Sequence, residues 1–511
     1  MTTEIELKLA LSPAAAARLA RLARIKRWAT AQPRRDHLVS RYYDTPGLQL
    51  RAKRVVLRMR QTGRNWIQTV KGAGQAQGSL HTRAEWETPV AGPAPELNLL
   101  PQPALAILNQ IQDAARNIRP IFITDITRTT WQFAIDGALI EAALDQGEIY
   151  AGRKKLPLCE IELELKHGNP RVLFDCALAL LDDVPLLPEH RSKAERGYDL
   201  YLRTQAQPVK ASPLILESFA TIGPAFQKIA FACLTQMNAN YDGVLHSRDP
   251  EFVHQMRVAL RRLRAAFAIF NRVFQSEEVL AISHGLDVLG MSLNAARDWD
   301  VWVEETLPRL MKEHPDAPES ALLWRRAQAH RIRHRREIRR ALASSAYARL
   351  VLVLERWLIG LPQAGLKREQ RKLWLRPVMP FARAALKKLD QKARERGENF
   401  AELSARKRHR LRIAIKKLRY GTDFFASLYS GEAACGYLKR LETMQTELGF
   451  FNDLAVAETL LAQIADSRPT PGLIRAANFT RDWLQAQNKA HHRTLVKGWK
   501  KFTQTPSFWQ A

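Results

Sequence analysis

Two carboxylates and an ammonium group alternate with apolar side chains near the start of the chain. Glu4, Glu6 and Lys8 stand at every second position of the run EIELKLAL, and the positions between them are Ile or Leu. In a β-strand, this alternation puts the three charges on one face and the apolar side chains on the other. Because buried charges need ionic partners or a metal, the charged face must look into water or into a polar cavity that holds ions.

The same alternation returns in four later segments, with charges of both signs. Arginine and lysine neutralise phosphate oxygens, and carboxylates two positions apart on a strand, roughly 6.6 Å, can converge on Mg²⁺ or Mn²⁺. The combination predicts metal-assisted phosphoryl transfer to water. The alternative is a set of solvated outer sheet faces, which repetition over five strands disfavours. The residues are Arg58, Arg60, Arg83, Glu85, Glu87, Glu141, Asp145, Glu160, Glu162 and Glu164, with further cations at Lys71, Arg128, Lys193 and Arg196.

A framework of short strands must position these side chains. The sequence predicts strands, separated by turn signals such as Asp136-Gly137, at Leu38–Asp44, Val55–Gln61, Trp66–Lys71, Thr82–Pro89, Pro120–Thr127, Thr129–Ile135, Ala138–Asp145 and Leu158–His167. Helices are expected at Ala14–Trp28, Ala104–Arg116 and Arg171–Asp182. Eight or more strands with few helices indicate a barrel. If its apolar faces pack outward against helices, the charges line its interior.

The second part of the chain has a helical instead of a strand-like sequence pattern. A polar, proline-bearing linker at 204–214 separates a first domain, 1–203, from long helices with a 3.6-residue period at 215–500. The pattern HxxRVxxRRLR at His254 returns as HxxRIxxKKLR at His409, and Asp298 returns as Asp453, both at an offset of 155 residues. We therefore predict an α+β protein of two domains, the second made of tandem helical bundles.

Each repeated helix carries a cationic stripe beside an apolar one. At 100° per residue, the cationic positions fall within about 80° of one another. They are His254, Arg257, Arg261 and Arg264 in the first repeat, and His409, Arg412, Lys416 and Arg419 in the second. Two such stripes could face one another across a groove, with Asp298 and Asp453 orienting the cations. The alternative is a solvated basic face without a ligand.

The overall charge favours a polyanionic partner. The 511 residues carry a formal charge of +28; 29 basic and 22 acidic residues lie in 1–205, against 50 and 29 in the remainder. Four scattered cysteines without a CxxC pair fit a reducing cytosol rather than a disulfide framework or zinc site. We find no signal peptide and no run of 18 apolar residues, so we expect a cytoplasmic protein without a membrane partner.

The first part resembles the CYTH domains, the triphosphate tunnel metalloenzymes. The resemblance rests on an ordered set of motifs over about 200 residues. These are Glu4-x-Glu6-x-Lys8, Tyr42-Tyr43-Asp44-Thr45, Leu57-Arg58-x-Arg60, Thr69-Val70-Lys71-Gly72, Arg83-x-Glu85-x-Glu87, Glu160-x-Glu162-x-Glu164 and Ser192-Lys193-x-x-Arg196-Gly197. The resemblance implies an eight-stranded antiparallel tunnel that binds triphosphate.

The resemblance also implies roles for individual residues. Metal ligands would be Glu4, Glu6, Asp145, Glu160 and Glu162, and the metal Mg²⁺ or Mn²⁺. The substrate would be held by Lys8, Arg58, Arg60, Lys71, Arg83, Arg128, Lys193 and Arg196. The catalytic set would be Glu4, Glu6, Lys8, Lys71, Glu85 and Glu87, of which Glu85 and Glu87 would orient the cations or fix water. Which carboxylate activates water stays open.

The helical part, over about residues 215–500, resembles the CHAD domain, which often follows CYTH and binds inorganic polyphosphate. A linear chain of phosphates suits spaced lysines and arginines, and its binding should weaken with salt. We expect the two stripes to form that polyphosphate site.

The two resemblances together predict an inorganic triphosphatase. It would hydrolyse tripolyphosphate to pyrophosphate and phosphate in the tunnel, and its CHAD domain would bind polyphosphate. One alternative is an enzyme of the same fold for an organic triphosphate, a class IV adenylate cyclase or a thiamine-triphosphatase. Another is a polyphosphate-binding protein without turnover, which the intact acidic set disfavours. We do not expect nucleic acid as the partner, because it would not explain the acidic strands.

Overall fold

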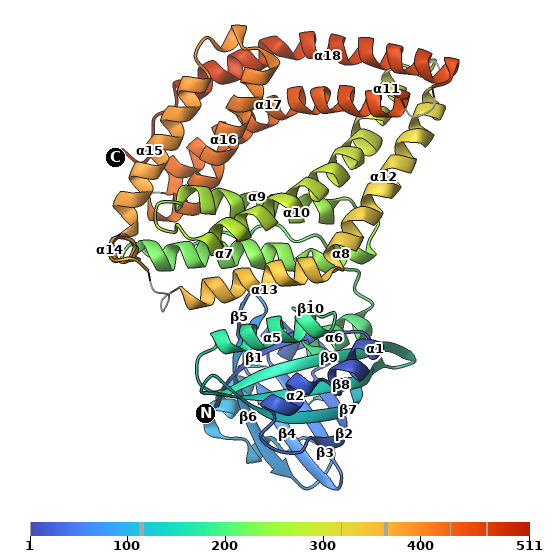
Figure 1. Cartoon of the computed structure of the whole chain (residues 1–511), viewed down its shortest axis with the longest axis vertical. Coiled ribbons are helices and arrows are strands. Elements are labelled where there is room, and N and C mark those ends of the chain that lie inside the picture. The colour runs from blue at the N-terminus through green and yellow to red at the C-terminus, as the bar shows by residue number, and fades with distance from the viewer. Residues whose placement is uncertain are drawn as a thin grey trace. The chain divides into compact units, whose positions relative to one another are not determined.

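The computed structural model describes residues 2–111, 117–317, 319–361, 366–429, 431–466 and 469–510. By their internal contacts the residues divide into two compact units. The first unit comprises Met1–Gln207 together with Ala343–Gln363, and the second comprises Pro208–Leu342 together with Ala364–Ala511. Figure 1 labels the helices and strands of the two units.

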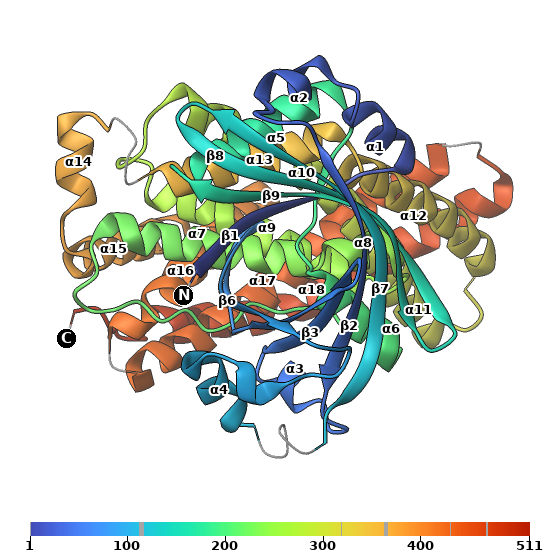
Figure 2. The ribbon, with the colours of Figure 1, turned by 90° about the horizontal axis from the view of Figure 1, so that it is seen from below.

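Eight antiparallel strands of the first unit close into a barrel (Figure 2). Their order is β1-β9-β8-β7-β2-β3-β4-β6, and pairing of β1 with β6 closes the ring, while β10 and β5 extend it at its edges. This confirms the predicted barrel. The strands are β1 (Thr2–Ala10), β2 (Arg34–Asp44), β3 (Val56–Thr62), β4 (Asn65–Lys71), β5 (Gln75–Gln77), β6 (Leu80–Val90), β7 (Arg119–Ile135), β8 (Ala138–Ala151), β9 (Lys154–His167) and β10 (Leu187–Pro188).

Helices cover the apolar outer faces of these strands. They are α1 (Pro13–Leu19), α2 (Ala23–Trp28), α3 (Gln49–Ala52), η1 (Leu97–Leu99), α4 (Gln102–Asn109), α5 (Arg171–Asp183) and α13 (Ser345–Gly360). The remaining helix, α6 (Lys193–Leu202), packs instead on inward-facing side chains of the barrel such as Phe122. Leu7 and Leu9 of β1 are wholly buried in a core that includes much of α5, while α4 packs on a second core around Leu57 and Val70. Because the apolar side chains point outward to helices, the alternating charged side chains point inward.

Four predicted elements, two strands and two helices, differ from the structure. The expected strands 120–127 and 129–135 form one strand, β7, because the ladder to β8 runs unbroken through the pair Arg128 and Asp145. The expected helix 14–28 is two helices, α1 and α2. The expected helix 104–116 corresponds to α4, which ends at Asn109, and its residues 112–116 lie outside the described ranges.

The second unit is helical throughout its regular elements. They are α7 (Ile222–Ala239), α8 (Tyr241–His246), α9 (Glu251–Ile269), α10 (Glu277–Val301), the π-helical turn η2 (Trp302–Thr306), α11 (Leu307–Glu313), α12 (Ser320–Leu342), α14 (Arg368–Trp374), α15 (Val378–Arg396), η3 (Phe400–Glu402), α16 (Ala405–Phe425), η4 (Ala426–Leu428), α17 (Gly431–Asp466) and α18 (Pro471–Thr503). The internal repeat pairs α9 and α10 with α16 and α17, and contacts join α9 to α16 and α10 to α17. Apart from the placement of α13 in the first unit, this is the predicted all-helical second part.

Two stretches of the second unit are long and apolar enough to span a membrane. These are Glu277–Glu313 and Gly431–Ala465, with mean hydropathies of 1.3 and 1.2. This is weak evidence for a membrane, because core helices of water-soluble proteins meet the same criterion.

Candidate functional site

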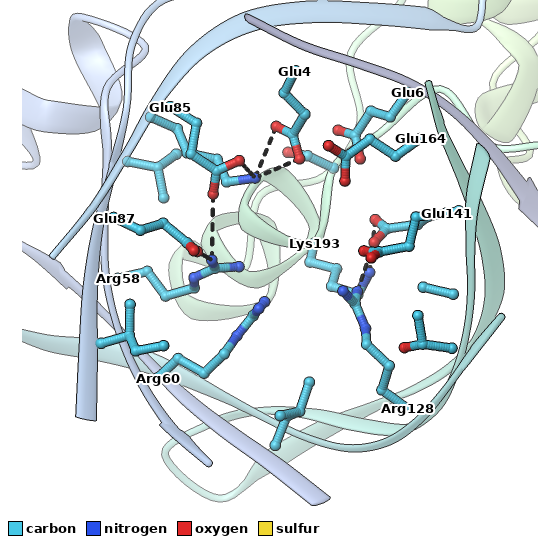
Figure 3. A pocket seen from close by; sticks show the side chains of 18 of the residues that line it. Glu4, Glu6, Arg58, Arg60, Glu85, Glu87, Arg128, Glu141, Glu164 and Lys193 are labelled. Atoms are coloured by element: carbon cyan, nitrogen blue, oxygen red, sulfur yellow. Dashed lines mark hydrogen bonds and ion pairs between the residues drawn. The ribbon is translucent and has the colours of Figure 1, made fainter. Parts of the chain in front are cut away.

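A polar cavity of about 750 Å³ occupies the interior of the barrel (Figure 3). Charged side chains from all eight barrel strands and from α6 converge on it. Of the predicted site residues, the cavity is lined by Glu4, Glu6, Lys8, Arg58, Arg60, Lys71, Arg83, Glu85, Glu87, Arg128, Glu162 and Lys193. The prediction that the charged strand faces look inward therefore agrees with the structure.

The opening strand contributes three buried charges that are paired with its neighbours. Glu4 accepts hydrogen bonds from Lys71 Nζ at 2.9 Å and Arg83 Nε at 2.9 Å, and Glu6 accepts one from Arg83 Nη2 at 2.7 Å. Burial opposes ionisation of Glu4, but the charges of Lys71 and Arg83 outweigh it and hold the pKa of Glu4 well below its usual range. These carboxylates are therefore anions at neutral pH.

Lys8 joins the opening strand to the far wall of the cavity. Its Nζ lies 2.9 Å from Glu6 Oε1 and 2.9 Å from Glu162 Oε1. Burial disfavours the ammonium form, but Glu162 and Glu6 outweigh it and raise the pKa of Lys8. The side chain is a fixed cation inside the tunnel.

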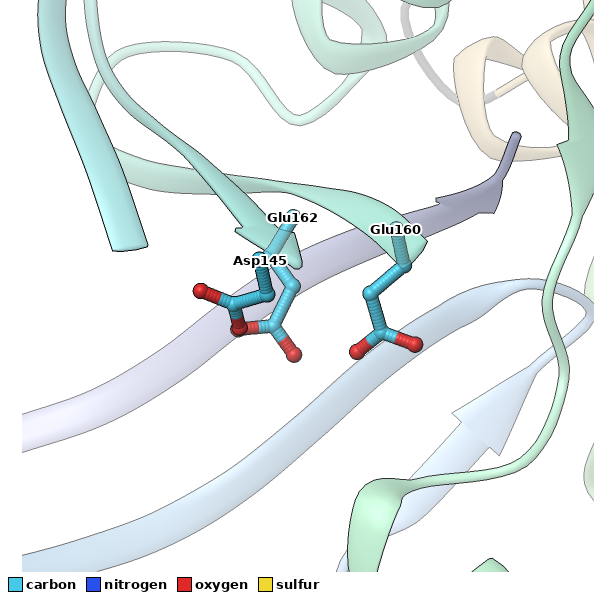
Figure 4. Close-up of side chains that lie close together, drawn as sticks. All are labelled: Asp145, Glu160 and Glu162. Carbon is cyan, nitrogen blue, oxygen red and sulfur yellow. The ribbon is translucent and has the colours of Figure 1, made fainter. Parts of the chain in front are cut away.

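Asp145, Glu160 and Glu162 form a compact acidic cluster on β8 and β9 (Figure 4). One carboxylate oxygen from each lies within 4.8 Å of the others, and Asp145 and Glu160 have no exposed surface. In the described ranges this is the one such group of three potential ligands. Carboxylate oxygens are the donors that Mg²⁺ and Mn²⁺ prefer, so the cluster fits a hard divalent cation.

Helix α6 delivers two cations to this cluster. Ser192 begins the helix in a capping box with Glu195, which fixes the first turn where Lys193 and Arg196 stand. Lys193 Nζ contacts Asp145 at 2.7 Å and Glu162 at 2.8 Å and also pairs with Glu160, while Arg196 pairs with Glu160. Burial opposes the charge, yet these carboxylates raise the pKa of Lys193. A network of opposite charges thus holds the cluster in place.

Arg128 closes the network from β7. Its Nε and Nη2 donate to the two oxygens of Asp145 at 2.7 and 2.6 Å, and Nη2 also donates to Glu162 at 2.7 Å. Burial and the charges of Arg128 and Lys193 act in opposite senses on Asp145, and the cations prevail, so its pKa is lowered. Forked pairing of this kind fixes both partners in one plane.

Arg60 differs from the other tunnel cations. In the described residues no carboxylate lies within ion-pair distance of it, and its one hydrogen bond is a long one, 3.4 Å, to Ser40 Oγ. Its neighbour Arg58, by contrast, lies 3.3 Å from Glu87 and 3.5 Å from Glu85. Burial and the charges of Arg58 and Arg128 lower the pKa of Arg60 to about 10, which leaves it protonated at neutral pH. A half-buried guanidinium without a carboxylate partner favours an anionic ligand.

Some predicted residues lie behind the cavity wall, and the prediction omitted others that line it. Asp145, Glu160 and Arg196 pack behind Lys193 and do not border the open space. Glu141 and Glu164 also line the cavity. The sequence placed them on charged strand faces but assigned them no role in the site. Other omitted lining residues are Arg34, Asp36, Tyr42 and Lys166. Strand alternation would have found Arg34 and Asp36, which are two positions apart on β2.

The second unit contains a groove of about 1070 Å³ where the two repeats meet. Of the predicted cations, Arg257, Arg261, Arg264, His409, Arg412 and Lys416 line it, whereas His254 and Arg419 do not. Each repeat makes a side-chain contact to an asparagine, but from positions that do not correspond in the repeat: Arg257 Nη1 donates to Asn294 Oδ1 at 3.1 Å, and His409 Nδ1 lies 3.0 Å from Asn452 Oδ1. The groove also contains Asp298 and Asp453 at equivalent places.

The groove holds an excess of positive charge. Within the described part of the chain, the buried Nε atoms of Arg257, Arg261 and Arg412 have no hydrogen-bond partner. Burial and then the charge of Arg261 lower the pKa of Arg257 to about 9 and that of Lys416 to about 5. Donors without acceptors and cations that repel one another favour binding of a polyanion.

Comparison with known proteins shows that two domain families match successive parts of the chain. The CYTH domain family matches residues 2–198, and the CHAD domain family matches residues 228–462. An inorganic triphosphatase from Haemophilus influenzae is 34% identical over 198 residues, 39% of this chain and 55% of that relative. The chain thus spans about half the length of that relative.

Solved structures match the two parts separately. The CHAD domain from the plant Ricinus communis is 34% identical, and the match covers 57% of this chain and 96% of that one with a TM-score of 0.49. HpAC1 from Hippeastrum, which has a dominant triphosphatase activity, is 17% identical, and the match covers 38% of this chain and 95% of that one with a TM-score of 0.29. The chain belongs to the proteins in which a CYTH domain is followed by a CHAD domain.

Proposed function

We propose that this protein is a metal-dependent inorganic triphosphatase that hydrolyses tripolyphosphate to pyrophosphate and phosphate inside the barrel. The observation that carries the proposal is the presence, in one barrel, of a buried acidic cluster that reaches the cavity through Glu162 and of a guanidinium in the same cavity that lacks a carboxylate partner. Each feature alone is common, but together they match a phosphate chain bound beside a divalent cation. The name of the Haemophilus influenzae relative supports the inorganic substrate.

In this proposal the cations of the tunnel bind and orient the phosphate chain. Arg58, Arg60 and Lys71 lie on β3 and β4 and would hold the phosphoryl oxygens at one side. Lys8, Arg83, Arg128 and Lys193 would supply further donors, each exchanging part of its present carboxylate pairing for phosphate. Arg196, which does not border the cavity, would hold Glu160 in place. Because buried cations already held in place need little reorganisation, they stabilise developing charge strongly.

The carboxylates would hold the metal and the water. Asp145, Glu160 and Glu162, assisted by Glu4 and Glu6, would hold Mg²⁺ or Mn²⁺, and such an ion, when bound, polarises phosphoryl oxygens and lowers the pKa of bound water. Glu85 and Glu87 pair with Arg58 and would orient it and fix water nearby. Glu141 and Glu164 border the same cavity and are additional candidates for water binding.

We further propose that the groove of the second unit binds inorganic polyphosphate. The unpartnered guanidinium Nε atoms and the repeated cationic stripes support this role. A linear polyanion can contact both repeats at once, and release of its counterions would drive the association. With four free cysteines, we propose a cytoplasmic location and no membrane partner.

The proposal is tested by phosphate release from tripolyphosphate, ATP and thiamine triphosphate, with Mg²⁺, with Mn²⁺ and with chelator. We expect metal-dependent turnover with tripolyphosphate as the best substrate, and loss of turnover in a Glu4→Gln/Glu6→Gln variant. Metal-independent hydrolysis, or full activity in the variant, would contradict the tunnel mechanism. A preference for ATP or thiamine triphosphate would show instead an enzyme of the same fold with an organic substrate.

A further inference from the structure

Helix α13, far along the sequence, is part of the unit that contains the barrel. It packs against α5 and β10, and its residues Ala348 and Leu352, both wholly buried, belong to the same core as Leu7 and Leu9 of β1. Two ion pairs flank this apolar contact: Arg349 Nη2 lies 2.5 Å from Asp182 Oδ1, and Arg356 Nη1 lies 2.9 Å from Asp175 Oδ1. Buried apolar contacts and two ion pairs therefore hold α13 on the barrel unit.

One carboxylate of α13 reaches a turn of the barrel. Glu355 has no exposed surface, and its Oε2 accepts a hydrogen bond from the backbone N–H of Ser79 at 3.0 Å. Ser79 is also wholly buried, and it follows Gly78, whose φ of +66° is the left-handed conformation that favours glycine. A side chain at Gly78 would clash with the carboxylate of Glu355. The turn and the carboxylate fit each other closely.

This turn begins the strand that carries three tunnel residues. Gly78 and Ser79 connect β5 to β6, and β6 then presents Arg83, Glu85 and Glu87. The first residues of β6 pair with β1, and Glu4 lies opposite Arg83 in that register. Arg83 is the residue that ties Glu4 and Glu6 together. A displacement of the turn would therefore shift the donors to both carboxylates of the opening strand.

We propose that Glu355 is a positioning residue for the tunnel: by holding the Gly78–Ser79 turn, it sets the place of Arg83 beside Glu4 and Glu6. The expected change in kinetics rests on the proposed triphosphatase activity, whereas the expected change in the Gly78–Ser79 turn does not. A buried carboxylate that accepts a backbone N–H makes a strong, charge-assisted hydrogen bond, and small displacements of catalytic groups change rates strongly.

The experiment uses the full chain and compares Glu355→Gln with wild type and with Arg349→Ala. The control removes an exposed ion pair of the same helix and leaves the Gly78–Ser79 turn untouched. Three quantities are measured: hydrogen exchange of the amides of residues 78–85, kcat and KM for tripolyphosphate, and the melting temperature. Glu355→Asp, which keeps the charge but shortens the side chain, serves where the glutamine variant does not fold.

We expect faster exchange at residues 78–85 and a fall of about tenfold in kcat/KM in the Glu355 variants at temperatures where they remain folded, with the control unchanged. A lower melting temperature with wild-type exchange in 78–85 and wild-type kinetics would overturn the inference, because Glu355 would then be only a structural anchor. If wild type itself does not hydrolyse tripolyphosphate, the proposed function fails, and the exchange measurement still decides the inference.

Discussion

The tunnel contains buried cations and the groove half-buried ones, and the surroundings of these cations shift their pKa values in opposite directions. In the tunnel, Lys8 and Lys193 lie within 3 Å of two or three carboxylates each, and their pKa values are raised. In the groove, Lys416 lies among arginines, and burial with the charges of Arg261 and Arg412 lowers its pKa to about 5. One site is balanced in charge before a ligand arrives, and the other is not.

This difference suggests different tasks. A balanced network holds its groups in one geometry, which chemistry requires, because donors that need no reorganisation stabilise a transition state best. An unbalanced groove gains most when a polyanion supplies the missing charge, which suits capture and not turnover. Arg60 is the exception in the tunnel, because like the groove arginines it lacks a full set of partners, and we therefore propose it as a contact for the substrate.

The largest effect should follow from removing charge at the acidic cluster. For Glu160→Gln/Glu162→Gln we expect loss of Mn²⁺ binding and a fall in kcat of about a thousandfold, since a bound metal contributes several kcal/mol to such reactions. Binding is measured by electron paramagnetic resonance and turnover by phosphate release. Asp125→Asn, an exposed carboxylate that does not line the cavity, is the control. Equal Mn²⁺ affinity in the double variant would refute the assignment of the cluster.

Arg60 should matter less, and chiefly through its charge. Loss of charge-assisted hydrogen bonds worth about 1.5–3 kcal/mol predicts a fall in kcat/KM of about 10- to 100-fold for Arg60→Ala, with partial recovery in Arg60→Lys. Steady-state kinetics with tripolyphosphate measures this. Arg153→Ala, in the exposed turn after β8, should behave as wild type. An unaffected Arg60→Ala enzyme would mean that the unpaired guanidinium is not a substrate contact.

The groove should respond to loss of one arginine from each repeat. We expect Arg257→Ala/Arg412→Ala to weaken polyphosphate binding about tenfold and to reduce its salt dependence by about two counterions, while turnover of tripolyphosphate stays close to wild type. Titrations at several salt concentrations measure this. Arg333→Ala/Arg340→Ala removes the same charge from α12 outside the groove. If both double variants lose the same affinity, general charge and not the groove binds the polyanion.

The smallest effect concerns pH. Lys416 is mostly neutral at pH 7 in the free groove, and a bound polyanion would raise its pKa, so binding takes up a proton. Affinity should therefore be highest near pH 5 and fall as pH rises towards the pKa of the complex. Calorimetry at pH 5 to 8 measures the slope, which Lys416→Met should reduce. An identical slope in that variant would assign the proton to another group.

Much of the tunnel could be predicted because alternation is local. Residues two apart on a strand share a face, so the inward direction of Glu4, Glu6 and Arg58 follows from the sequence alone. The pairing of Lys193 with Asp145 and Glu160 does not, because it depends on where α6 docks. For the same reason the groove includes Arg257 but leaves out His254, one turn away on the same predicted stripe. The sequence did not predict that α13 packs on the barrel unit, because the apolar pattern of a helix does not show which domain core the helix joins.

The insertion of α13 has a consequence for how the protein is made. Ser79 and Glu355 are separated by 276 residues, so the barrel unit remains unfinished while the intervening chain is synthesised. At typical elongation rates, the roughly 150 residues between α6 and α13 take about 8–30 s to emerge. During that interval the surface of α5 that α13 later covers stays open to water and to other nascent chains. We expect the ribosome-bound barrel to recruit chaperones at this surface until residue 360 has emerged.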